Sequence, residues 1–99
     1  MSALAEPATV VLPSVIDLKA VNPLHQEVLA LRGRPLNIDA SEVTRLGALG
    51  LQVLLSAKAT WMLDGAPFNI VQPSDDFSGA LQLFGATDLN TADAEELRP

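Results

Sequence analysis

The side chains of this chain that could carry out acid–base chemistry are few and lie far apart. His25 is the single histidine, and it falls in a predicted helix on the face away from the apolar positions. A solvated helix position is therefore favoured over catalysis. Asp17 and Asp39 stand at the ends of predicted strands, where they could form a carboxylate pair, but capping of nearby backbone N–H groups is the favoured role for each. The sequence predicts a protein that is not an enzyme.

Metal and phosphate sites also lack support in the sequence. The chain has no cysteine, which excludes disulfides and thiolate metal ligands. The acidic pair at 75–76 and the acids within 93–96 do not have the ligand spacing of a calcium or magnesium loop. Gly47 and Gly50 precede a predicted helix, where a weak anion site is the less favoured interpretation, and no glycine-rich phosphate motif is present. We expect no metal ion and no cofactor.

The composition limits the kinds of partner. The formal net charge is −6, from 12 acidic and 6 scattered basic residues, which argues against nucleic acid as a partner. One tryptophan and three phenylalanines do not suffice for a platform on which single-stranded bases stack. The N-terminal segment lacks the features of a secretory signal, and the apolar runs are far shorter than the ~20 residues that span a bilayer. We expect a cytoplasmic protein with no direct membrane insertion.

One α/β domain over residues 1–99 must position these side chains, because 99 residues with 48% hydrophobic content suit a single core. The predicted elements are, in order, strands at 9–12 and 14–18 (or a hairpin split by Pro13), a helix at 22–32, a strand at 35–40, a helix at 49–63, a strand at 67–71 and a helix within 73–85. This β-β-α-β-α-β-α order predicts a small, mostly parallel sheet of about four strands with helices. Residues 1–8 are predicted to be an N-terminal extension, and 87–99 an acidic tail or short helix.

Local signals set the ends of the helices. Asn22 and Pro23 predict the start of the first helix and Gly33 its end. Gly65 ends the second helix, whereas Ser74 caps the last helix and Gly85 ends it. Helical spacing then predicts the buried side chains, which are Leu24, Val28 and Leu31 in the first helix, Leu51, Leu54, Leu55, Ala59 and Met62 in the second, and Phe77, Leu81 and Phe84 in the third, with Trp61 as a further core residue.

Three segments, at residues 11–31, 36–55 and 68–89, together resemble the STAS domain family, which includes anti-sigma-factor antagonists and the cytoplasmic tails of sulphate transporters. The family's opening strand, Asp-containing turn and first helix are similar to VLPSVIDLKAVNPLHQEVLAL, with Asp17 at the usual acidic position. Its signature strand, loop and second helix match LNIDASEVTRLGALGLQVLL. Its fourth strand and third helix resemble FNIVQPSDDFSGALQLFGATDL. The resemblance covers about residues 9–90 and implies a STAS-like fold.

The loop before the second helix departs from the family pattern. Phosphorylated antagonists read Asp-Ser-Ser-Gly or Asp-Ser-Thr-Gly there, and a partner kinase modifies the first Ser. This chain reads Gly47-Ala48-Leu49-Gly50, so Ala48 stands at the acceptor position without a hydroxyl. A phosphorylation switch cannot operate at Ala48. Ser41 and Thr44 are alternative acceptors nearby, although a loop or capping role is favoured for each.

The resemblance implies a non-catalytic protein-interaction module in bacterial signal transduction, similar to an anti-sigma factor antagonist. The partner would have a histidine-kinase-type ATP fold, either a chemotaxis histidine kinase, which the RLGALGLQVLLSA run favours, or an anti-sigma serine kinase. The residues that the resemblance assigns to partner binding are Asp17, Lys19, Ser41, Glu42, Thr44, Arg45, Leu46, Ala48, Leu49 and Gln52. Leu46 and Leu49 are each either core residues or exposed anchors of this surface.

Two alternatives remain open from the sequence. Small STAS proteins also occur as subunits of ATP-binding-cassette complexes that transport lipid, which would give a membrane ATPase as partner. Some STAS domains bind small ligands or nucleotides, which would give a binding protein instead. The sequence does not predict an oligomeric state.

Overall fold

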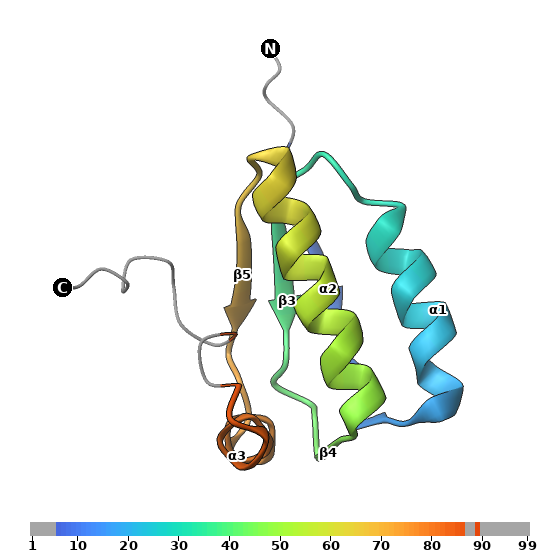
Figure 1. Cartoon of the computed structure of the whole chain (residues 1–99), viewed down its shortest axis with the longest axis vertical. Helices are drawn as coiled ribbons and strands as arrows, with labels where there is room; N and C mark the ends of the chain where they lie inside the picture. The colour runs from blue at the N-terminus through green and yellow to red at the C-terminus, as the bar shows by residue number, and fades with distance from the viewer. Residues whose placement is uncertain (1–5, 87–88, 90–99) are drawn as a thin grey trace, which may run out of the picture.

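The structure, a computed structural model, describes residues 6–86 and residue 89 (Figure 1). Its main sheet is parallel, with β3 (Leu36–Asp39) between β1 (Ala8–Val11) and β5 (Phe68–Val71). Helices α1 (Leu18–Leu29) and α2 (Ala48–Asp64) lie side by side in front of this sheet in Figure 1. The predicted α/β class with parallel strands is confirmed. The predicted tail or helix at 87–99 lies, apart from buried Leu89, outside the described residues.

A second, two-stranded sheet corrects the predicted start of the chain. β2 (Val15–Ile16) pairs in parallel with β4 (Arg45–Leu46), not with β1, so the first two strands do not form a hairpin. β4 itself was not predicted and adds one strand to the expected order. Two-residue strands are too short to show an alternating pattern, which is the signal that identifies a strand in sequence.

The predicted start of α1 was wrong. The helix begins at Leu18, because the Asp17 carboxylate accepts hydrogen bonds from the backbone N–H groups at its first turn. Asn22 and Pro23, the predicted start, lie inside the helix. The last helical residue is Leu29, and a turn with a left-handed Gly33 (φ 93°) leads to β3.

The other helix ends follow the sequence signals. The hydroxyl of Ser74 accepts a hydrogen bond of 3.0 Å from the N–H of Phe77 and caps α3 (Asp75–Phe84). Gly65 and Gly85 adopt left-handed conformations directly after α2 and α3, as glycine does readily at a helix C-terminus.

The core lies between the main sheet and the helices. Its largest fully buried side chains are Trp61, Phe77, Leu12, Ile16, Leu36, Ile38, Leu54, Leu81, Leu89, Val10, Val28 and Val43. Several predicted core positions are instead exposed or partly exposed, namely Leu31, Leu55, Ala59, Met62 and Phe84. In α2 the true buried stripe is formed by Gly50, Leu51, Leu54, Ala57 and Trp61. The prediction is confirmed for Leu51 and Leu54 and wrong for the other three positions, because apolar residues occur on every face of this helix.

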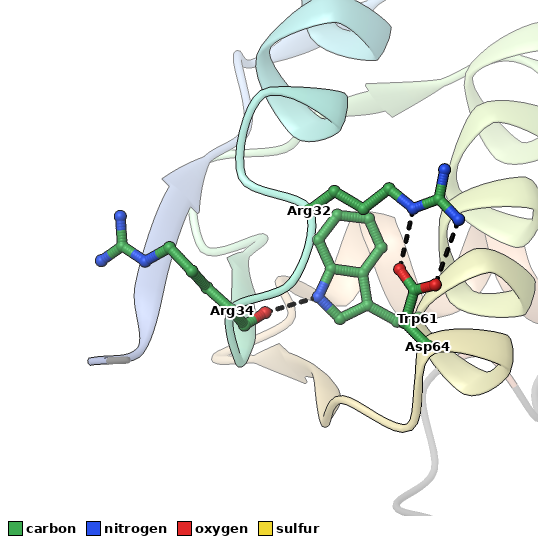
Figure 2. Close-up of polar contacts among 4 residues, drawn as sticks. All are labelled: Arg32, Arg34, Trp61 and Asp64. Carbon is green, nitrogen blue, oxygen red and sulfur yellow. Dashed lines mark hydrogen bonds and ion pairs between the residues drawn. The ribbon is translucent and has the colours of Figure 1, made fainter. Parts of the chain in front are cut away.

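Side chains fix the C-terminal end of α2 (Figure 2). The indole N–H of Trp61 donates a 2.6 Å hydrogen bond to the carbonyl oxygen of Arg34. Arg32 binds the carboxylate of Asp64 through Nε and Nη2, at 2.8 and 3.1 Å. These contacts join α2 to the turn between α1 and β3.

Among the described residues, no helix is long and apolar enough to cross a membrane.

Candidate docking surface

Pairing of β2 with β4 brings the N-terminal ends of α1 and α2 together. The carbonyl oxygen of Ser14 accepts hydrogen bonds from the N–H groups of Thr44 and Arg45, at 2.7 and 3.1 Å. The carbonyl oxygen of Ile16 accepts one of 3.2 Å from the N–H of Gly47. Segments about 30 residues apart in sequence, one before each helix, are thus locked side by side.

At the start of α1, the capping carboxylate is flanked by exposed side chains. Oδ1 of Asp17 accepts from the N–H groups of Lys19 and Ala20, at 3.1 and 3.2 Å. Lys19 points its charge to solvent, and Leu18 between them is 72% exposed. Sequence reasoning missed Leu18. Its place directly after the capping residue Asp17 is the signal that could have identified Leu18. The first residue of this helix faces outward, so an apolar side chain there is exposed.

The second carboxylate also binds a backbone group. Oδ1 of Asp39 accepts a 2.9 Å hydrogen bond from the N–H of Ser41. The Ser41 hydroxyl and this N–H hold the pKa of Asp39 below its usual value, because both stabilise the charged carboxylate. The predicted capping roles of Asp17 and Asp39 are therefore confirmed.

The loop between β3 and β4 exposes most of its predicted binding residues. Ser41, Glu42, Thr44 and Arg45 are exposed, although the Thr44 hydroxyl is occupied in donating a 3.0 Å hydrogen bond to the carbonyl oxygen of Ser14. The loop is held from the side of α3, where the Ser74 hydroxyl donates a 2.6 Å hydrogen bond to the carbonyl oxygen of Val43. The two hydroxyls considered as acceptors are both engaged, the one on Thr44 by Ser14 and the one on Ser41 by Asp39.

The first turn of α2 presents small and apolar side chains. Gly47 caps the helix without a side-chain hydrogen bond, and Ala48 is its first, exposed residue. The structure separates the two leucines that the sequence left undecided: Leu46 is core at 6% exposure, whereas Leu49 is 49% exposed. Gln52 follows one turn later and is exposed. Nine of the ten predicted residues are therefore exposed, and the tenth, Leu46, is buried in the core beneath them.

The described residues show neither a cluster of metal ligands nor room for a nucleotide in the hollow between α1 and α2. They contain no group of three or more His, Cys, Asp or Glu that could hold a metal ion. A hollow of about 20 Å³ lies between α1 and α2, lined by His25, Val28, Leu29, Val53, Ser56, Ala57 and Thr60. That volume is close to the space of one water molecule, far too small for a nucleotide.

Comparison with known protein families identifies the family of this chain. A family model described as "Mlab, STAS domain" matches residues 2–95, nearly the whole chain. No curated protein matches it.

Proposed function

The chain belongs to the STAS domain family, and we propose that it is a non-catalytic docking module that binds a protein through the N-terminal ends of α1 and α2. STAS domains commonly mediate protein–protein interactions and include anti-sigma factor antagonist-like modules. We place the binding surface, called here the docking surface, at Asp17, Lys19, Ser41, Glu42, Thr44, Arg45, Ala48, Leu49 and Gln52, with Leu18 added from the structure.

The observation that carries this proposal is the exposed apolar centre of the docking surface. Leu18 and Leu49, at 72% and 49% exposure, lie at the starts of two adjacent helices with Ala48 beside them. Polar and charged side chains, among them Lys19 and Arg45, form the rim. Apolar anchors inside a polar rim are the usual composition of a protein interface.

For the partner we propose a kinase with a histidine-kinase-type ATP fold, in a cytoplasmic bacterial signalling complex. Ala48 removes the hydroxyl at the family's acceptor position, so binding is not switched there by phosphorylation. The complex would then form whenever both proteins are present. Control would come from the amount of either protein or from the state of the partner.

The second candidate is a STAS subunit of an ATP-binding-cassette complex that transports lipid. The observation that favours it is the matched family, which is the Mlab type of STAS domain. The same docking surface would then contact a membrane-associated ATPase. The two candidates share the surface and differ in the partner.

Affinity capture from a lysate of the source organism tests both candidates. Three baits are compared, the native chain, Ala48→Glu and the control Leu83→Glu, which changes a residue of α3 that is 85% exposed. A glutamate in the first turn favours the α2 dipole, so Ala48→Glu is expected to keep the fold. A soluble kinase recovered by the native and control baits but not by Ala48→Glu supports the first candidate. A transporter ATPase with the same pattern supports the second, and a partner captured equally by all three baits contradicts the docking surface.

A further inference from the structure

One residue at the start of α3 binds both ends of a turn that carries part of the docking surface. The backbone N–H of Ser74 donates a 3.1 Å hydrogen bond to the carbonyl oxygen of Ala40, and its hydroxyl donates one of 2.6 Å to the carbonyl oxygen of Val43. Ala40 and Val43 are buried, at 0% and 1% exposure, whereas Ser41 and Glu42 between them are exposed. These four consecutive residues are called here the docking turn.

The contact at Ala40 follows from a proline after β5. In a parallel pair, a residue that donates its N–H to one residue of the neighbouring strand accepts a hydrogen bond from the residue two places further on. Ala40 donates to the carbonyl oxygen of Val71 at 3.1 Å, so its own carbonyl oxygen would accept from the next residue but one. That residue is Pro73, which has no N–H. The N–H of Ser74 supplies the donor instead.

The backbone at Gln72 accompanies this change of donor. Gln72 has a φ of 50°, and among the described residues it is the one residue other than glycine with a positive φ. This left-handed conformation is uncommon for a residue with a side chain, and it persists where the surrounding contacts hold it. The chain gains one residue between Val71 and Ser74, as in a β-bulge, and the N–H of Ser74 then meets Ala40.

The Ser74 hydroxyl has a second role, because it also caps α3. Its oxygen accepts a 3.0 Å hydrogen bond from the N–H of Phe77, while its proton is donated to Val43. A hydroxyl can do both at once, since it has one donor and two acceptor sites. One side chain therefore joins the docking turn to α3, which lies against β4 (Figure 1).

The bonds within the docking turn hold it less firmly. The carboxylate of Asp39 binds the N–H of Ser41 at 2.9 Å at the beginning of the turn. The bond that closes the turn, from the N–H of Val43 to the carbonyl oxygen of Ala40, is long at 3.4 Å. The closed shape of the turn therefore depends on the two bonds from Ser74.

We propose that Ser74 is a positioning residue for partner binding, which it supports by fixing the docking turn and not by touching the partner. This inference rests on the proposed function, because Ser41 and Glu42 belong to the docking surface. A turn that is ordered before the partner arrives loses little conformational freedom on binding, and this favours a tight complex.

Three substitutions of Ser74 separate its two roles. Ser74→Thr keeps a hydroxyl that caps α3 and donates to Val43. Ser74→Asp keeps a strong capping acceptor, but its carboxylate has no proton to donate to Val43. Ser74→Ala loses the acceptor and the donor without adding a charge. Far-ultraviolet circular dichroism and urea unfolding check that each variant keeps the fold.

The first test needs no partner and measures backbone NMR relaxation of the purified chain. The order parameters of Ser41 and Glu42 are expected at about 0.85, the value of a rigid backbone, in the native chain and in Ser74→Thr. In Ser74→Asp they are expected to fall below about 0.6, while those within α3 stay at the native level because the cap is kept. Unchanged order parameters at Ser41 and Glu42 in folded Ser74→Asp overturn the proposal.

The second test measures the affinity of these variants for the protein that the native bait captures, after that protein has been purified. Ser74→Asp and the uncharged Ser74→Ala are each expected to weaken binding about tenfold, whereas Ser74→Thr binds within about twofold of the native chain. If Ala48→Glu loses binding and Ser74→Asp does not, the docking surface stands and the positioning role of Ser74 is overturned. If neither variant changes the affinity, the docking surface and the positioning role both fail.

Discussion

At its C-terminal end α2 is held by side chains, whereas at its N-terminal end it is held by backbone groups. At the C-terminal end, Arg32 and Asp64 form an ion pair with two hydrogen bonds, and the Trp61 indole N–H donates to the carbonyl oxygen of Arg34 (Figure 2). At the other end, Gly47 donates its N–H to Ile16 and offers no side-chain cap. Fixing the helix at one end leaves the side chains at the other free to face a partner. In the proposed function, stability and recognition are therefore concentrated at opposite ends of one helix.

Removal of the buried indole of Trp61 is expected to lower the stability of the fold more than any other change at either end of α2. Trp61 is fully buried, contacts Phe68 with ring centroids 6.2 Å apart and bonds the carbonyl oxygen of Arg34. Trp61→Ala should lower the free energy of unfolding by about 3–5 kcal/mol, from lost burial and an unpaired carbonyl. Urea unfolding followed by far-ultraviolet circular dichroism measures this. A loss below about 1 kcal/mol would mean that the C-terminal end is not the stabilising one.

Substitution of Gly50 tests how closely α2 packs on Ile16 and Leu46 at its N-terminal end. A Cβ on this residue would lie 2.5 Å from Cγ2 of Ile16 and 3.2 Å from Cδ1 of Leu46. Gly50→Ala should destabilise by about 1–2 kcal/mol, because a crowding cost of about 2–3 kcal/mol, the upper part of the usual range, exceeds the gain of about 1 kcal/mol in helix propensity. Gly79→Ala, in α3 with no atom within 4 Å of its Cβ, is the matched control and should stabilise. If Gly50→Ala stabilises as much as the control, α2 and β2 are not in close contact.

Removal of the side-chain cap of α1 should lower the stability less than either of these substitutions. Asp17→Ala removes the acceptor for the N–H groups of Lys19 and Ala20 and should destabilise by about 1 kcal/mol. Asp17→Asn keeps an oxygen at the same place and is expected to retain most of the stability. Urea midpoints of the two variants check this. Equal losses in both would show that the negative charge, not the capping hydrogen bond, is what matters.

The ion pair between Arg32 and Asp64, at the C-terminal end of α2, should give the smallest effect on stability, and this effect should depend on pH. Bonding to Arg32 holds the pKa of Asp64 below its usual value. The pair therefore stabilises the fold above the unfolded pKa of the carboxyl group, and this stabilisation is lost as pH falls through the lower folded pKa. Arg32→Gln should be less stable than the native chain at pH 7, and the two should converge in acid. A difference that does not change with pH would contradict this role for the pair, and thermal unfolding across the acid range measures it.

The sequence predicted the parts of the fold that are encoded locally. Ser74, Gly65 and Gly85 mark helix ends because capping needs only neighbouring residues. Asn22 and Pro23 gave a valid start signal as well, but the cap at Asp17 begins the helix about one turn earlier. Two competing local signals cannot be ranked without the tertiary contacts that favour one of them.

The exposure of the residues proposed for docking could be predicted from the sequence only in part. The loops reach one surface because β2 pairs with β4. The strand at 14–18 was predicted, but the two residues of β4 leave no pattern in the sequence that indicates this pairing. Leu46 and Leu49 are three residues apart and equally apolar, yet one is core and the other half-exposed. Burial at such places is decided by packing with Ile16, a residue 30 positions away from Leu46, which sequence periodicity does not report.

The most direct test of the proposed function is the affinity of the captured partner for purified variants, measured by isothermal titration calorimetry. The docking surface predicts that Ala48→Glu weakens binding at least tenfold, about 1.4 kcal/mol, because a charge enters an apolar contact. Leu83→Glu should bind with native affinity, and circular dichroism of both variants should match that of the native chain. Native affinity of a folded Ala48→Glu variant would contradict docking at the start of α2.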